Sequence, residues 1–271
     1  GLEFFTVDFF QPVILVTLFA EPPQNWLDDL LTKSRSLFDE SKTALLVQRR
    51  YLAGVPSELC FGVLPEQSIA RRGNLQFSLH LVQQQNSGFF LDMEPGRGWL
   101  EKNAEGKRIL NLFAYTCAFS VVAVAANAEV VVNVDMSSAA LNLGRSNHQR
   151  NSLDKKRSEF LAENILKSWG RIKKRGPYDV VIIDPPSYQK GSFIAEKDYA
   201  KVIRRLPELM PAGGLVLACL NAPELTEGFL RQAFSEHCSV AEFLERLQPH
   251  KDFPDVDPEQ QLKLLVYRLV V

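Results

Sequence analysis

The run Val180–Ile183 is apolar and β-branched at every position, and it ends at Asp184-Pro185-Pro186. A strand that is apolar on both faces belongs inside a parallel sheet covered by helices. Because ligands bind beyond the carboxyl ends of such strands, we expect Asp184 at a ligand-binding edge. The prolines fix φ at about −65° and remove two N–H donors, which predicts a stiff turn whose carbonyls can grip a flat, amine-bearing group. The alternative is that Asp184-Pro185-Pro186 is only an ordinary exit from a strand into a loop.

Strands and helices alternate from Lys107 onward, which predicts an α/β domain. The expected strands cover residues 108–113, 130–135, 159–162, 178–184, 215–221, 240–247 and 263–271. The expected helices cover residues 118–126, 138–150, 165–174, 197–209 and 224–237. The last two strands leave no room for a crossover helix, so we expect the final strand to insert antiparallel as a hairpin partner. The sequence therefore predicts a seven-stranded, doubly wound, Rossmann-like sheet.

Residues 1–93 have a different pattern, and we expect a small mixed α+β domain there, ahead of a second domain at 94–271. One amphipathic helix, 25–38, lies among strand-like runs at 4–10, 13–20, 44–51, 59–64 and 75–82. Residues 88–100 are rich in glycine and proline and read as the junction between the two domains. The chain begins at Gly1 and not at methionine, so a further N-terminal module is compatible with it.

Composition narrows the possible functions. The chain has 271 residues, 46% of them hydrophobic, so it can bury a large core. Its net charge is only −1, so it has no overall electrostatic field that would attract a polyanion. Its four cysteines lack metal-ligand spacing and a disulfide pattern, which indicates a reducing, cytoplasmic setting. The apolar run 12–20 is too short to cross a bilayer, so we expect no membrane segment. The four histidines are scattered, and we expect no metal site.

The turn after the first strand of the second domain, Ala114-Tyr115-Thr116-Cys117, contains no glycine. A pyrophosphate needs close approach to a glycine-rich turn, so NAD, FAD and nucleoside triphosphates are disfavoured. Asp135 ends the second strand, where a carboxylate can accept hydrogen bonds from both hydroxyls of a ribose. A ribose without a phosphate suggests S-adenosylmethionine. The alternative for Asp135 is a structural acid that stabilises the dipole of the following helix.

Four motifs together resemble a known family. The motifs cover residues 86–92, 107–116, 134–137 and 184–187, and in this order they are similar to the class I S-adenosylmethionine-dependent methyltransferases. Within that family, the bacterial large-subunit ribosomal RNA methyltransferases I and K are the nearest group. The likeness covers roughly residue 86 to the end of the chain, and the small domain before it also looks like the one that precedes catalysis in that group.

The resemblance implies a seven-stranded methyltransferase sheet and a set of site residues. The residues implied to hold S-adenosylmethionine are Phe113, Ala114, Tyr115 and Thr116 around the methionine part, Asp135 on the ribose, and Met136 and Asn164 near the adenine. Asp184, Pro185 and Pro186 would line the methyl-transfer site, with Asp184 also facing the cofactor. Asp92 and Arg97 match the segment that enters the catalytic domain, and we expect both to lie near the substrate.

The chain departs from that family at three places. Cys117 stands where the family usually has glycine, and Glu94 stands where it usually has arginine. The 5-methylcytosine enzymes of the group carry a nucleophilic cysteine near the exit of the fifth strand, where this chain has Asn221. Methylation of carbon 5 needs a thiolate, whereas methylation of a nitrogen needs only alignment of its lone pair. We therefore predict transfer to a nitrogen, with Asn221 beside the acceptor and Cys219 as a small buried residue.

RNA binding would depend on local features. Of the basic clusters, Arg49-Arg50 and Arg71-Arg72 are the best candidates for phosphate contacts, because the small domain has no other evident role. Further clusters lie at 155–157, 171–175 and 204–205, and any of them could be only a solvated face. Beside the proline turn, Ser187 would help to hold the acceptor, and Tyr188 and Phe193 could stack on an extruded base or cover the pocket as a lid.

These features predict a cytoplasmic S-adenosylmethionine-dependent methyltransferase acting on a base nitrogen of RNA, most simply ribosomal RNA. One alternative is a methyltransferase for a small molecule or a protein side chain, since the proline turn can grip any planar amine. A second is a noncatalytic RNA-binding protein that kept the fold, for which the glycine-free loop is the argument. The oligomeric state stays open, and a homodimer is one of the states that the sequence allows.

Overall fold

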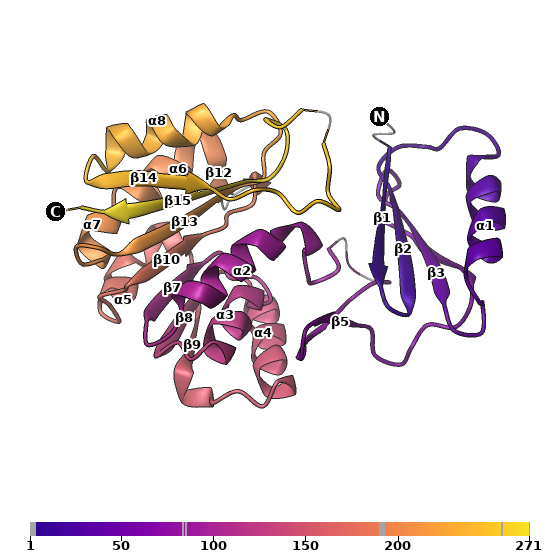
Figure 1. Ribbon diagram of the computed structural model, residues 1–271, viewed down its shortest axis with the longest axis horizontal. Coiled ribbons are helices and arrows are strands. Elements are labelled where there is room, and N and C mark those ends of the chain that lie inside the picture. The colour runs from indigo at the N-terminus through magenta and orange to yellow at the C-terminus, as the bar shows by residue number, and fades with distance from the viewer. Residues whose placement is uncertain (1–3, 83, 85, 190–192, 256, 271) are drawn as a thin grey trace. The chain divides into compact units, whose positions relative to one another are not determined.

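The structure is a computed structural model that describes the chain except for residues 1–3, 83, 85, 190–192, 256 and 271. The chain forms two compact units, Gly1–Leu91 and Asp92–Val271, and each is described by itself (Figure 1). The first unit contains the expected strands and helix of the small domain. The second contains the larger sheet and the candidate site.

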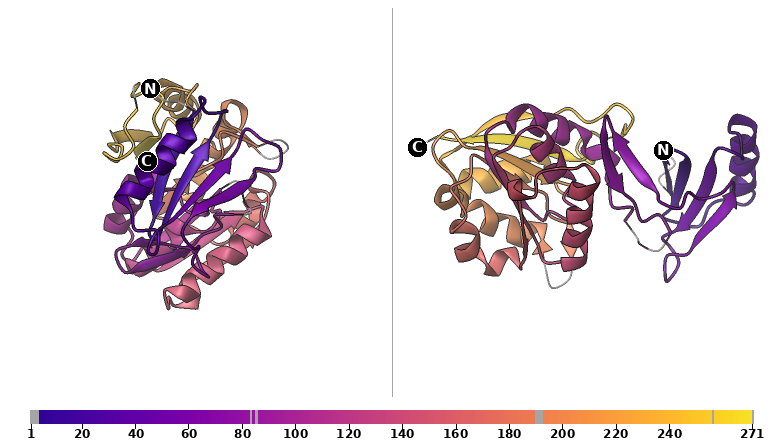
Figure 2. Two further views of the ribbon diagram at one scale, coloured as in Figure 1. Left: turned by 90° about the vertical axis from the view of Figure 1, so that its right-hand side faces the viewer. Right: turned by 90° about the horizontal axis from the view of Figure 1, so that it is seen from below.

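The first unit is built on a four-stranded sheet in the order β1-β2-β3-β4. Its strands are β1 (Phe5–Phe10), β2 (Val13–Leu18), β3 (Ala44–Arg49) and β4 (Ser57–Phe61). Strands β2 and β3 run parallel, and helix α1 (Trp26–Leu37) makes the crossover that a parallel pair requires. Figure 2 shows α1 on one face of this sheet, where its apolar side packs on Ile14, Val16 and Leu45. A separate hairpin joins β5 (Ile69–Arg72) to β6 (Leu75–Ser78), and the sequence did not predict β5.

The second unit contains the predicted seven-stranded sheet, in the order β14-β15-β13-β10-β7-β8-β9. The strands are β7 (Arg108–Leu112), β8 (Val130–Asp135), β9 (Ser158–Ala162), β10 (Val180–Ile183), β13 (Leu215–Leu220), β14 (Ala241–Arg246) and β15 (Lys263–Leu269). The last strand, β15, pairs antiparallel with both β13 and β14, which confirms the expected insertion. The sheet is therefore parallel around β10 and antiparallel at one edge.

Alternate residues of the central strands face two different helical layers, which explains why these strands are apolar at every position. Val181 and Ile183 belong to the core under α5 (Trp169–Lys173), α6 (Ala195–Ile203), α7 (Leu206–Leu209) and α8 (Glu227–His237). Val180 and Ile182 face the opposite layer, made by α2 (Glu94–Asn103) and α3 (Ala118–Ala125). Helix α4 (Ser138–Arg150) lies beside α3, and Ser137 is its N-cap, accepting from the N–H of Ala140.

The helices differ from the predicted ones in three places. The junction at 88–100 contains a helix, α2, because Pro95 is tolerated in a first turn and Gly96 allows the helix to approach Phe119 and Leu264. A Cβ at Gly96 would lie 3.3 Å from the Phe119 ring. The helix predicted at 165–174 is a 3₁₀ turn, Ile165–Lys167, followed by α5. The helix predicted at 197–209 divides into α6 and α7, with Pro207 in the first turn of α7.

The turn between β7 and α3 adopts left-handed backbone angles without glycine. Phe113, Tyr115 and Cys117 have φ values of 59°, 46° and 61°. Such angles cost a non-glycine residue about 1–2 kcal/mol each, so the surrounding structure must hold the turn in place. The side-chain amide of Asn147 in α4 donates to the carbonyl oxygen of Thr116 over 3.1 Å. Gly144 in the same helix leaves room for the buried side chain of Cys117.

We predict that Gly144→Ala lowers the free energy of unfolding by about 1–3 kcal/mol. The added Cβ would lie 2.5 Å from Sγ and 2.9 Å from Cβ of Cys117. Adding Cys117→Gly should restore most of the loss, because it removes the clashing side chain and puts glycine at a left-handed position. Urea unfolding of the two variants measures this. Gly170→Ala is the matched control, because its added Cβ would meet no atom within 4 Å outside its own stretch of helix. This variant should not lower the free energy of unfolding. A double variant no more stable than Gly144→Ala alone would show that another contact causes the loss.

Candidate functional site

The register of the parallel strands brings the predicted residues to one edge of the sheet. Ile183 pairs with Leu112 of β7 on one side and with Ala218 of β13 on the other. Leu112 in turn pairs with Val134 of β8. The next residue of each strand or turn therefore lies in one row at the carboxyl edge. That row contains Asp135, Phe113, Asp184 and Cys219.

The Asp135 carboxylate is fixed by two backbone donors. The N–H of Tyr115 donates to Oδ2 over 2.9 Å, and the N–H of Ser137 donates to Oδ1 over 2.8 Å. A carboxylate has about four acceptor sites, so each oxygen keeps capacity for a further donor. Beside it, the Met136 side chain is 47% exposed, as an apolar group that packs on a flat ring would be before a ligand binds. Asn164 starts the 3₁₀ turn at 165–167 and makes no capping bond with its side chain. These residues fit a ribose and an adenine.

Asp184 lies in a group of charges that is largely removed from water. The pKa of Asp184 is raised to about 7, chiefly by burial and also by the Asp92 carboxylate, while the Arg97 guanidinium opposes both. Burial also raises the pKa of Asp92, again with Arg97 opposing. Because two carboxylates share one nearby cation, the protonation of Asp184 is poised near neutral pH.

Arg97 and Phe193 are both buried side chains. Arg97 is only 2% exposed, and its Nε donates to Oε2 of Glu94 over 3.2 Å, so it sets the charge of the site from within. Phe193 is 1% exposed, and its ring packs edge-on against Phe113 at 4.9 Å and near Tyr199 at 6.1 Å. The prediction that Phe193 stacks on a base is therefore corrected, because core packing covers the ring. Tyr188 lies in β11 (Tyr188–Gln189), which pairs with β12 (Phe193–Ile194), and its side chain is outside the described residues.

The turns that follow β10 and β13 are joined by hydrogen bonds. The Ser187 hydroxyl donates to the carbonyl oxygen of Asn221, so the proline turn is tied to the exit of β13. Beneath this contact, the buried Tyr199 hydroxyl lies 3.2 Å from the carbonyl oxygen of Ile183 and 2.8 Å from that of Cys219. These contacts fix the separation of the two strand ends.

Lys263 supports the same turn, and the sequence reading missed both it and Tyr199. The Lys263 side chain is completely buried, and its Nζ donates to the carbonyl oxygen of Ala222 over 3.2 Å. Burial lowers its pKa, and the acid Glu259 opposes that shift. The available signal for Lys263 was a lysine at the start of a largely apolar strand. No sequence signal marked Tyr199, because tyrosine is common on amphipathic helices.

Cys219 is an inert core residue. It is 0% exposed and packs among Ile182, Leu217 and Leu264. Burial raises the pKa of its thiol, and the carboxylates of Asp184 and Asp92 raise it further. A thiol that stays protonated and lies inside a strand cannot attack a substrate, so the prediction of a small buried residue agrees with its place in the structure.

Two of the three basic clusters of the second unit lie away from the site. Residues 155–157 precede β9, 171–175 precede β10, and 204–205 lie between α6 and α7, ahead of β13. The clusters 155–157 and 204–205 therefore lie toward the amino edge of the sheet, opposite Asp184. Arg171 instead pairs with Glu163, which follows the carboxyl end of β9. In the first unit, Arg49 pairs with Glu58 over 2.8 Å, and Arg50 donates to Oε1 of Gln48 and lies over the Phe19 ring. Also in that unit, Arg71 is exposed and Arg72 is half-buried in the β5–β6 hairpin.

The described part of the chain lacks both a metal-binding cluster and a membrane-spanning helix. Among those residues, no group of three or more His, Cys, Asp and Glu side chains could hold a metal ion. Within the same residues, no helix combines the length and the apolar character needed to span a membrane.

We predict that Asp184→Asn stabilises the protein above pH 7 by about 2 kcal/mol, less than the whole pKa shift implies because Asp184 is partly exposed. Burial raises the pKa from 3.8 to about 7, so the favourable contribution of Asp184 is complete below pH 3.8 and is lost as the pH rises toward 7. Asparagine stays neutral, so the wild type and Asp184→Asn should have the same free energy of unfolding near pH 4. Burial lowers the pKa of His148 to about 4, but His148 titrates in both proteins, so its contribution to the difference in stability cancels. Urea unfolding between pH 4 and 8 measures this, with the exposed Glu105→Gln as control. A constant difference across that range would contradict the assignment.

Comparison with known proteins gives consistent matches. The family model described as S-adenosylmethionine-dependent methyltransferase matches residues 1–268. Ribosomal RNA large subunit methyltransferase I of Aeromonas hydrophila is 27% identical over 269 residues, which cover 94% of this chain and 68% of that protein. The protein of the same name from Yersinia pseudotuberculosis is 25% identical over 267 residues, which cover 94% of this chain and 67% of that protein.

Solved structures share the architecture. A methyltransferase in complex with S-adenosylhomocysteine (SAH) has a TM-score of 0.89 and 26% identity, covering 98% of this chain and 72% of that one. An S-adenosylmethionine-dependent methyltransferase from Streptococcus mutans has a TM-score of 0.88 and 25% identity, covering 98% and 71%. The tRNA m1G37 methyltransferase of M. jannaschii shares the fold, with a TM-score of 0.70, 13% identity and coverage of 100% and 77%. With a family match over almost its whole length, this chain belongs to the S-adenosylmethionine-dependent methyltransferases and uses S-adenosylmethionine as its cofactor.

Proposed function

We propose that this methyltransferase modifies a nitrogen of a base in RNA, with ribosomal RNA as the first candidate, in the cytoplasm. The observation that carries the proposal is the exit of β13, which presents the exposed Asn221 while the neighbouring thiol, Cys219, is fully buried. Carbon 5 of a pyrimidine needs a thiolate to activate the ring, and Asn221 cannot provide one. A nitrogen acceptor needs only correct alignment.

The acceptor site of this proposal is the turn Asp184-Pro185-Pro186-Ser187 together with Asn221. S-adenosylmethionine, when bound, supplies an electrophilic methyl group. The turn and Asn221 orient the acceptor, and the Asp184 carboxylate accepts the proton that an amino nitrogen must lose when it becomes methylated. A pKa of about 7 suits this role, because a large fraction of Asp184 is ionised at neutral pH.

The cofactor site of this proposal is the edge formed by the β7–α3 turn and the end of β8. The residues that would hold S-adenosylmethionine are Phe113, Ala114, Tyr115, Thr116, Asp135, Met136 and Asn164. Asp135 would bind the ribose hydroxyls with the oxygens that Tyr115 and Ser137 keep in place. The negative charge of Asp135 and Asp184 also favours a cationic sulfonium.

RNA is the proposed acceptor because the curated relatives are named as ribosomal RNA methyltransferases. Phosphate contacts are assigned to the first unit, at Arg49, Arg50, Arg71 and Arg72. Two of the three basic clusters of the second unit, 155–157 and 204–205, lie toward the amino edge of its sheet, and Arg171 of the third is paired with Glu163. Acidic residues dominate the carboxyl edge, so a polyanion needs a cationic surface elsewhere.

Asp135→Ala should weaken binding of SAH at least about tenfold, because hydrogen bonds to a charged group contribute about 1.5–3 kcal/mol each. Isothermal titration calorimetry on folded protein measures this. Asp154→Ala is the matched control, because Asp154 also caps a helical turn but lies at the opposite edge of the sheet. A dissociation constant for Asp135→Ala within twofold of the wild type would show that Asp135 has only a capping role. A wild type that binds RNA but no SAH would favour the noncatalytic reading.

Cys219→Ala should keep at least half of the wild-type rate of methyl transfer, whereas Asp184→Asn should lose about 100-fold or more. The assay measures transfer from S-adenosylmethionine to unmodified transcripts of 16S and 23S ribosomal RNA. Complete loss in a folded Cys219→Ala variant would restore a thiolate mechanism and a carbon acceptor. Transfer to small amines or to protein but not to RNA would support the alternative substrate class.

A further inference from the structure

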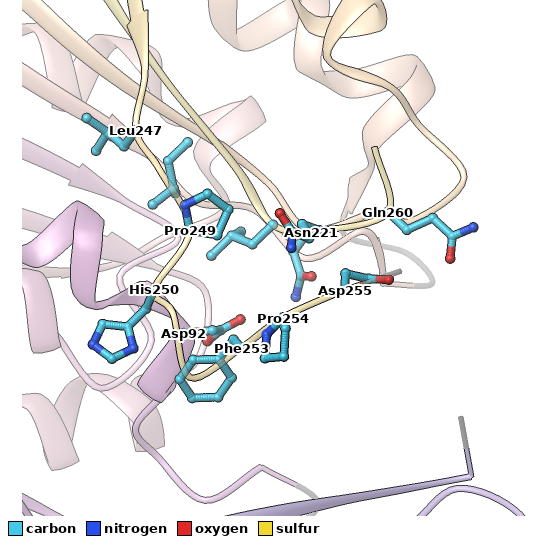
Figure 3. A pocket seen from close by; sticks show the side chains of 12 residues that line it. Asp92, Asn221, Leu247, Pro249, His250, Phe253, Pro254, Asp255 and Gln260 are labelled. Atoms are coloured by element: carbon cyan, nitrogen blue, oxygen red, sulfur yellow. The ribbon is translucent and has the colours of Figure 1, made fainter. Parts of the chain in front are cut away.

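A cavity of about 250 Å³ opens beside the predicted acceptor site, within the second unit. Asp92, Asn221 and Leu264 line it together with residues of the connection between β14 and β15. Figure 3 shows Asp92 and Asn221 beside that connection. From that connection the lining includes Leu247, Pro249, His250, Phe253, Pro254 and Gln260. The sequence pattern assigned no role to residues 247–262.

The connection is held at its far end by β14 and α8. Arg246 donates from Nη2 to the carbonyl oxygen of Pro258 over 2.7 Å and from Nη1 to Oε1 of Glu259 over 3.2 Å. The N–H of Glu227 donates to Oε2 of Glu259 over 2.9 Å. Next to this anchor, Lys263 holds the turn at Ala222. The cavity therefore has walls that are fixed by charged hydrogen bonds.

The lining combines a flat apolar face with polar side chains that include the amides of Asn221, Gln260 and Gln261. Phe253 is half-buried, and Figure 3 shows its ring beside Asp92 and Pro254. The Asn221 side chain points into the same space in this view. An aromatic face suits stacking of a planar ring, and an amide offers a donor and an acceptor side by side, as the edge of a base requires.

The position of the cavity links it to methyl transfer. The carbonyl oxygen of Asn221 accepts the Ser187 hydroxyl of the proline turn, so the cavity adjoins that turn. Asp92, which lines the cavity, is close enough to raise the pKa of Asp184. At about 250 Å³ the cavity lies below the roughly 300–1,000 Å³ of pockets for drug-sized ligands, so it suits one ring system better than a whole nucleotide.

We propose that this cavity receives the acceptor base, unstacked from its RNA strand, with the Phe253 ring against the face of the base and the Asn221 amide at its edge. The inference rests on the proposed function and adds the residues that select the base. The β14–β15 connection is then a specificity element, and Phe253 takes the stacking position at this cavity.

Phe253→Ala should lower kcat/KM for transfer to unmodified ribosomal RNA transcripts about tenfold, since stacking on an aromatic ring contributes about 1–3 kcal/mol per base. Phe253→Tyr should stay within threefold of the wild type, because it keeps the stacking face. Lys251→Ala is the matched control on the same connection, since Lys251 is exposed and does not line the cavity. All three variants should bind SAH with the wild-type dissociation constant by calorimetry.

The outcomes separate the two proposals. A wild type that transfers methyl groups to RNA, with Phe253→Ala equally active, would overturn the base cavity and leave the proposed function intact. A wild type that binds SAH but methylates no RNA would overturn the proposed function, and the base cavity with it. Loss of SAH binding in Phe253→Ala would also count against the inference, because the connection would then support the cofactor instead of the acceptor.

Discussion

The site depends on a carboxylate placed at the end of a strand that has no exposed face. β10 is buried on both sides, so Asp184 emerges from the core with little water around it, and its charged form is disfavoured. Asp92 adds a second negative charge, and the buried Arg97 offsets part of both. Removing only Arg97 would leave two acids without their cation, which is costly in a buried group. The buried guanidinium is therefore part of the site even though it does not face solvent.

The edges around Asp184 are held by contacts between segments far apart in sequence. Ser187 reaches Asn221, Tyr199 joins the carbonyls of Ile183 and Cys219, and Lys263 reaches Ala222. Each contact satisfies a polar group that burial would otherwise leave costly. Together they fix where the proline turn and the exit of β13 lie relative to each other. An acceptor that must align within a fraction of an ångström needs such a frame.

Sequence reasoning succeeded where one local pattern determines the structure and failed where tertiary packing decides. The apolar run before Asp184 and the acid that ends β8 predicted two of the strands and the sheet edge that Asp184 and Asp135 share. Helix α2 was missed because Pro95 and Gly96 disfavour helix in isolation, whereas Gly96 here allows close packing on Phe119. Phe193 packs on Phe113, 80 residues away in the sequence, and Lys263 binds Ala222, 41 residues away, and no local spacing reveals either contact.

The turn after β7, at the edge proposed to bind the cofactor, keeps its left-handed backbone angles without glycine, the residue that usually adopts them. Three left-handed residues are kept in place because Asn147 binds the carbonyl of Thr116, Gly144 makes space for Cys117, and Asp135 accepts from Tyr115. The same Asp135 is the residue proposed to bind the ribose. A ribose bound at Asp135, as proposed, would therefore meet a turn whose shape the same carboxylate already holds through the N–H of Tyr115. On that proposal, the structural role and the binding role of Asp135 are compatible.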